Sequence, residues 1–65
     1  MKVTINGQTN NIDARTIDEI VKMKELDASG LVIEHNGEII KQKDWPKQKV
    51  AEGDKLELLS FVGGG

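Results

Sequence analysis

The sequence contains no cysteine, which excludes several kinds of chemistry at once. Without a thiol there is no disulfide framework, no thiolate metal site and no cysteine nucleophile. The single histidine, His35, has no second histidine near it, so no zinc-binding spacing is present and we expect no metal site. A lone histidine on a strand is typical of a structural or exposed residue.

Excess charge and long apolar runs are also lacking. The 9 basic and 11 acidic residues give a formal charge of −2, whereas nucleic-acid binders usually carry a clear basic excess. Trp45 is the only aromatic residue within the lysine-rich segment 41–49, too few for a single-strand stacking surface. No apolar run reaches membrane length, and no apolar signal region follows Met1-Lys2. We therefore expect a cytoplasmic protein that binds neither nucleic acid nor membrane.

The chain is short, with 65 residues. A domain of this size buries only ~60% of the surface that its unfolded chain exposes. Ligand pockets commonly run to ~300–1,000 Å³, which leaves little room for a deep active site here. We therefore expect no enzyme acting alone, and binding modules, carriers and small regulators remain.

Two hairpins are predicted from alternation and turn residues. Met1–Ile5 alternates apolar and polar residues, and Asn6-Gly7 is suited to a type I′ turn into a polar edge strand over Gln8–Ile12. The apolar segment Leu31–His35 indicates an inner strand, and the second hairpin places Asn36-Gly37 before a short strand at 38–40. After a turn at 53–54, a last strand is expected over 55–61.

One helix is predicted between the hairpins. Thr16 and Glu19 fit a capping box, in which both side chains satisfy the first free amides of a helix. Ile17, Ile20 and Val21 fall on one stripe, and the pattern breaks at Lys24. We expect the helix to end within a turn of Lys24, with Gly30 as the stop signal.

Pairing the first strand with the last places the helix across one face of a mixed sheet. This arrangement is the β-grasp, or ubiquitin-like, fold of the α+β class. We expect a β-grasp domain over residues 1–61 and a flexible glycine-rich tail over 62–65. Trp45 is expected to plug the open edge of the small core, since tryptophan is usually largely buried.

The terminal run Gly63-Gly64-Gly65 is the most informative motif. It could be a cloning remnant or a floppy end, because glycine adds disorder. Its positive use is steric, since a bare backbone can thread into a narrow channel and present the terminal carboxylate to a nucleotide. Joined to AMP, that carboxylate can be attacked by a sulfur nucleophile to leave a thiocarboxylate. With no cysteine in the chain, a carrier of sulfur would have to use its C-terminus.

The end of the last strand offers a second clue. Strict alternation from Leu56 and Leu58, on the inner face, puts Leu59 and Phe61 outside. Either a bulge shifts the register, or two apolar side chains lie exposed beside the tail. An exposed apolar patch commonly marks a partner surface.

Taken together, these residues resemble the thiamine-biosynthesis sulfur carrier family (ThiS). The resemblance spans the whole chain and lies in the order of its motifs: the first strand into Asn6-Gly7, the Thr16-Ile17…Ile20-Val21 helix, Leu31–Ile40 with Asn36-Gly37-Glu38, Trp45, Gly53-Asp54 and the ending Phe61-Val62-Gly63-Gly64-Gly65. The segment Lys22–Gly30 departs from the family because it is charged and lacks a Leu-Leu pair.

The resemblance implies a non-catalytic carrier with no bound cofactor. A ubiquitin-activating-type adenylyltransferase (ThiF) would use ATP to adenylate the Gly65 carboxylate. A sulfurtransferase or cysteine desulfurase would supply sulfur, and thiazole synthase (ThiG) would accept it. Gly64 and Gly65 match the family's terminal pair, with Gly63 also threading into the partner. Leu59, Phe61 and Val62 are expected to form the partner interface.

Three alternatives remain open at this point. Gly-Gly ends also occur in molybdopterin-synthase small subunits, although these tend to be longer, and in ubiquitin-like modifiers that form isopeptide bonds. A β-grasp interaction or RNA-binding module with an incidental tail is the third. Rescue of a molybdopterin carrier mutant, stable high-mass conjugates, or full function without the tail would favour these alternatives in turn.

Overall fold

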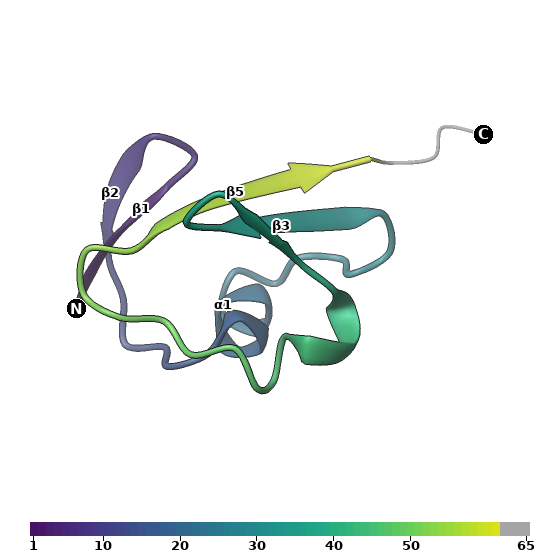
Figure 1. Cartoon of the computed structure of the whole chain (residues 1–65), viewed down its shortest axis with the longest axis horizontal. Helices are drawn as coiled ribbons and strands as arrows, with labels where there is room; N and C mark the ends of the chain where they lie inside the picture. Colours follow the sequence, from purple (N-terminus) through teal and green to yellow (C-terminus); the bar gives the residue numbers. More distant parts are fainter. Residues whose placement is uncertain (62–65) are drawn as a thin grey trace.

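Strands from both ends of the chain form one sheet. The computed structural model describes residues 1–61. Figure 1 shows α1 lying across one face of the sheet, and β5, in yellow, carrying the chain to the end of the described residues. The elements are β1 (Lys2–Ile5), β2 (Gln8–Asn11), α1 (Ile17–Met23), β3 (Leu31–His35), β4 (Glu38–Ile40), the short 3-10 helix η1 (Gln42–Asp44) and β5 (Lys55–Ser60).

The strand order is β2-β1-β5-β3-β4, and the pairing is mixed. β1 and β5 run parallel through Thr4 opposite Lys55 and Ile5 opposite Leu56, while the other neighbours are antiparallel. The predicted β-grasp arrangement is confirmed, with the first and last strands side by side. β2 is an edge strand, as its polar sequence indicated.

Both hairpins turn where Asn-Gly pairs predicted them. In each pair both residues have positive φ, 50° and 80° at Asn6 and Gly7 and 52° and 88° at Asn36 and Gly37. A type I′ turn requires this combination, and its twist matches that of the flanking strands.

Every amide of the first turn of α1 has a partner. Thr16 caps the helix, and its hydroxyl accepts from the Glu19 amide at 3.2 Å. The amides of Ile17 and Asp18 donate to carbonyls in the segment 45–48, at 3.0 and 3.2 Å. The predicted capping box is changed in one respect, because the Glu19 carboxylate accepts from the Arg15 amide instead of the Thr16 amide. The helix is thereby tied to the crossing segment before β5.

The helix ends close to Lys24, as predicted, but the expected stop signal at Gly30 is wrong. Glu25 takes the left-handed conformation at φ 53°. The Glu25 amide donates to the Lys22 carbonyl, and the Leu26 amide donates to the Val21 carbonyl. These two bonds form the Schellman motif of helix C-termini. Glycine usually fills such a position, so a glutamate gave no signal in the sequence. Gly30 instead belongs to the turn that enters β3.

The core lies between α1 and the inner face of the sheet. Trp45 closes one side of it, buried as predicted, and its indole nitrogen Nε1 donates to the Ile40 carbonyl at 3.0 Å. The buried apolar residues are Val3, Ile5, Ile12, Ala14, Ile17, Ile20, Val21, Ile33, Trp45, Val50 and Leu56. Within residues 1–61, no helix has the length and apolar character needed to cross a membrane.

Candidate functional site

The alternation of β5 continues without a bulge to the end of the described chain. β5 runs antiparallel to β3, and the pairing is continuous from Leu56 opposite His35 to Ser60 opposite Leu31. The Phe61 amide extends this ladder by donating to the Gly30 carbonyl at 2.7 Å. The register therefore decides between the two alternatives, and Leu59 and Phe61 lie on the outer face, away from α1.

Both side chains are exposed, Leu59 by 43% and Phe61 by 62%. Leu59 sits directly opposite Val32 of β3. Ile39 of β4, exposed by 66%, pairs with Glu34, two residues along β3 from Val32, and so lies on the same face. We name Val32, Ile39, Leu59 and Phe61 the outer-face patch.

Sequence reasoning missed the β3–β4 part of this patch. The strand around Ile39 has three residues, too few for alternation to reveal which apolar side chain faces the core. The pairing of Ile40 with the buried Ile33 turns Ile40 inward and Ile39 outward. The outward orientation of Ile39 could be identified only from the pairing of β4 with β3.

Two carboxylates lie beside the patch on the same face. Glu34 and Glu57 are directly opposite each other on β3 and β5, and both are partly buried. Like charges in this position disfavour each other across a sheet. The outer face therefore carries exposed apolar groups beside two carboxylates, with the exposed Lys55 on the same face at the start of β5.

β5 is held differently along its two sides. On the β1 side, backbone pairing covers two residues, after which the Asn6 side chain accepts from the Leu58 amide at 2.8 Å and donates to the Leu58 carbonyl at 3.2 Å. On the β3 side, pairing continues to Phe61 and Gly30. In the described chain, the last backbone hydrogen bond before Val62 is therefore the bond from Phe61 to Gly30, on the β3 side of β5.

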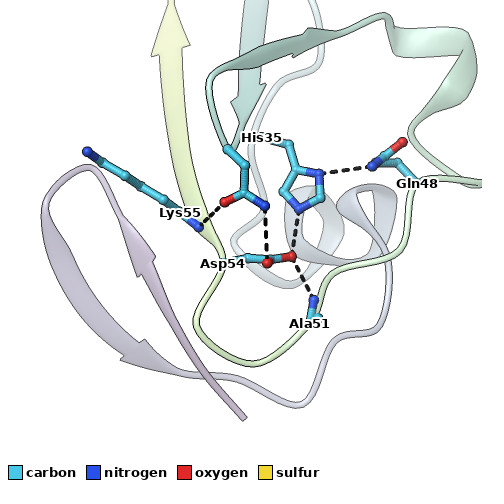
Figure 2. Close-up of polar contacts among 6 residues, drawn as sticks. His35, Gln48, Ala51, Asp54 and Lys55 are labelled. Atoms are coloured by element: carbon cyan, nitrogen blue, oxygen red, sulfur yellow. Dashed lines mark hydrogen bonds and ion pairs between the residues drawn. The ribbon is translucent and has the colours of Figure 1, made fainter.

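A polar cluster fixes the start of β5. Figure 2 shows His35 between Gln48 and Asp54, with Nε2 of His35 2.6 Å from Oδ2 of Asp54. The side-chain amide nitrogen Nε2 of Gln48 donates to Nδ1 of His35 at 2.9 Å. Nε2 of His35 therefore carries the hydrogen donated to Asp54. Asp54 also accepts from the Ala51 amide and the Asn36 side chain. His35 is accordingly a structural residue, one of the two roles expected for it.

The carboxyl of Asp54 is stabilised in its charged form. Partial burial raises the pKa of this group, but hydrogen bonds from His35, the Ala51 amide and the Asn36 side chain outweigh the burial. The pKa of Asp54 therefore lies below its ordinary value. This cluster joins the hairpin at 36–37 to the turn before β5, and it was not visible in the sequence because its members come from three separate segments.

A second feature is an open hollow of about 670 Å³ between α1 and the segment 42–46. Two of its charged side chains, Asp18 and Lys22, form an ion pair at 2.9 Å along the helix. Within residues 1–61, no three His, Asp or Glu side chains gather in a way that could hold a metal ion.

The comparison with known families connects this geometry to a function class. The model of the ThiS family matches residues 3–65, which is nearly the whole chain and includes the terminal glycines. The chain belongs to the ThiS family. The match covers the outer-face patch and β5 together with the segment that follows it.

Curated relatives and a solved ThiS structure agree with this membership. A protein of Bacillus subtilis named sulfur carrier protein ThiS is 30% identical over 53 residues, covering 82% of this chain and 80% of its own. The crystal structure of ThiS from Geobacter metallireducens superposes with a TM-score of 0.86 at 29% identity and 100% coverage of both chains.

A third relative has a different length. A thiazole synthase of Paramagnetospirillum magneticum is 35% identical over 66 residues, covering all of this chain but only 20% of that protein. The ThiS-like segment is thus about one fifth of the relative.

The sequence-predicted site residues fall into two groups. Leu59 and Phe61 are exposed side by side on the outer face, while Val62, Gly63, Gly64 and Gly65 lie outside the described residues. The expected partner interface and the sulfur attachment point stay predictions.

Proposed function

We propose that this ThiS-family chain is a sulfur carrier for thiazole synthesis in thiamine formation, with the Gly65 carboxylate as its reactive group. A carboxylate oxygen attacks the α-phosphorus of ATP, pyrophosphate leaves, and an acyl-adenylate forms. The terminal sulfur of a persulfide then attacks the acyl carbon and AMP leaves. A thiol reduces the resulting acyl disulfide to the thiocarboxylate. A ThiF-like adenylyltransferase supplies the first step, and a sulfurtransferase or cysteine desulfurase supplies the sulfur.

The observation that carries this proposal is the position of the outer-face patch at the end of β5. Leu59 lies on the central strand β5 and Phe61 lies directly after it. Both side chains are exposed, and the chain continues from Phe61 into residues 62–65. A partner that docks on this patch meets the following glycines, whose bare backbone fits a channel too narrow for side chains. Val62 extends the interface, and Gly63 and Gly64 thread behind it.

The thiazole synthase relative supports a ThiG-like acceptor. A protein of that name contains a segment 35% identical to this whole chain. Carrier and acceptor working in sequence would explain such a combination. The family match likewise favours thiazole synthesis over the molybdopterin and modifier alternatives. In this scheme the carrier is no catalyst and binds no cofactor, ATP is bound by the activating partner, and the reactions take place in the cytoplasm.

The test is an intact-mass measurement. The purified chain is incubated with ATP, a ThiF-like enzyme, a cysteine desulfurase, cysteine and a thiol. We expect an AMP adduct when the sulfur source is omitted, and otherwise a mass gain equal to exchange of one oxygen for sulfur on the C-terminal peptide. Addition of thiazole synthase and its other substrates should return the carboxylate.

The control is the same chain extended by one residue after Gly65, which keeps the fold but moves the free carboxylate. This chain should gain no mass. Equal modification of both chains would place the reaction on another group, and an unmodified wild-type chain with a demonstrably active enzyme would contradict the carrier function.

A further inference from the structure

The backbone of Gly30 touches the backbone of Phe61 more closely than a side chain would allow. The Gly30 carbonyl accepts from the Phe61 amide at 2.7 Å. A Cβ atom added to Gly30 would overlap the Phe61 carbonyl oxygen, at a separation that real Cβ atoms do not show. Any other residue at position 30 therefore displaces the chain at Phe61.

Gly30 is itself held in a fixed place. The Leu31 amide donates to the Ala28 carbonyl at 3.1 Å, and Gly30 has φ +75° at the third position of this turn, where glycine is preferred. The Asp27 side chain accepts from the Ser29 amide at 2.9 Å and closes the start of the turn. Ala28 packs against the core. The turn thus connects the core to the chain just before Val62.

We propose that Gly30 is a positioning residue for adenylation: its turn fixes the place and direction in which β5 delivers the chain to residues 62–65. This inference rests on the proposed function, because it concerns how the Gly65 carboxylate reaches the activating partner. On the β1 side the last hydrogen bonds of β5 are at Leu58, so the Phe61–Gly30 bond is the final hydrogen-bonded restraint within the described chain.

Displacement at Phe61 should affect catalysis by the partner more than docking. Leu59 pairs with Val32 two residues before the Gly30 contact. We expect this pairing to persist when the contact is lost, so that part of the outer-face patch keeps its geometry. Misplacement of a reacting group by ~1 Å can reduce a rate ~100-fold. We therefore expect the kcat of adenylation to fall while the KM for the carrier changes little.

The experiment compares Gly30→Ala with Gly37→Ala. Both glycines have positive φ, +75° and +88°, so alanine is strained at either site, but a Cβ at Gly37 meets nothing within 4 Å. With a ThiF-like enzyme, Gly30→Ala should lower kcat ~10-fold or more relative to Gly37→Ala, with KM within ~3-fold. Amide hydrogen exchange at Phe61 should be faster in Gly30→Ala only.

A second pair keeps the test valid if Gly30→Ala does not fold. Phe61→Pro removes the amide that donates to Gly30, and Phe61→Ala keeps this amide while removing the same side chain. The proline variant should have the lower kcat. Equal kcat values within each pair would overturn the inference, whereas a wild-type chain that is not adenylated would overturn the proposed function and this inference with it.

Discussion

At the scale of single residues, the least expected backbone conformation is that of Glu25. A left-handed residue other than glycine is strained by about 1 kcal/mol because its Cβ approaches the following carbonyl. Glu25 nevertheless holds this conformation, with both Schellman hydrogen bonds formed behind it. The bonds that end the helix here offset the strain.

Replacing Glu25 by glycine should therefore stabilise the protein. Glycine relieves the strain but also makes the unfolded chain more flexible, so a net gain of ~0.5 kcal/mol in unfolding free energy is expected. Urea denaturation measures this gain directly. Glu25→Ala is the control, because it removes the same carboxylate and keeps the Cβ, and an equal gain in both variants would contradict the backbone explanation.

Asp54 should make stability depend on pH in the acidic range. Its pKa is lower in the folded state than in the unfolded state, so its contribution is fully present above the ordinary aspartate pKa of about 3.9. The contribution is lost as the pH falls through the lowered folded-state pKa. Denaturation of the wild type and of Asp54→Asn should differ at pH 7, and the difference should shrink toward pH 3. A constant difference would contradict this origin.

At the scale of elements, the outer face of β5 should contribute to binding and little to stability. Leu59 and Met23 are similarly exposed, by 43% and 47%, but Met23 lies on α1. Leu59→Gln should raise the KM for adenylation ~10-fold or more if Leu59 anchors the partner. Met23→Gln should leave it within ~2-fold, and both variants should change unfolding free energy by under ~0.5 kcal/mol. Equal KM values in steady-state assays would remove Leu59 from the interface.

The elements were also the part most accessible from the sequence. Alternation and Asn-Gly turns predicted both hairpins, and the Ile17-Ile20-Val21 stripe predicted the buried side of α1. The end of the helix near Lys24 was predicted, but the left-handed Glu25 that terminates it was missed because a glutamate carries no such signal. The outward orientation of the Ile39 side chain and the polar cluster around His35 were missed. Both depend on contacts between distant segments, which no local pattern contains.

At the scale of the whole molecule, the core is too small to lose a large residue. At about 0.05–0.15 kcal/mol per residue, a chain of this length has roughly 3–10 kcal/mol of unfolding free energy. Trp45 is only 2% exposed, and truncation of such a residue to alanine costs about 3–5 kcal/mol.

Trp45→Ala should accordingly leave a substantial unfolded fraction at 37 °C, seen as lost amide dispersion in NMR spectra. Trp45→Phe keeps most of the apolar volume, although its hydrogen bond to Ile40 is lost, and should remain folded. If Trp45→Ala melted at the wild-type temperature, Trp45 would not be the plug of the core.

The position of β5 between β1 and β3 has a consequence for synthesis of the chain. Among the described strands, the one that joins the two hairpins into one sheet is the last to be translated. A nascent or truncated chain that stops before Lys55 has two hairpins with no strand to connect them, so the complete sheet forms only once the segment from Lys55 onward is present. In the proposed function, partner enzymes that recognise the folded outer face would therefore meet only polypeptides whose synthesis has passed through β5, and incomplete chains would not compete for activation.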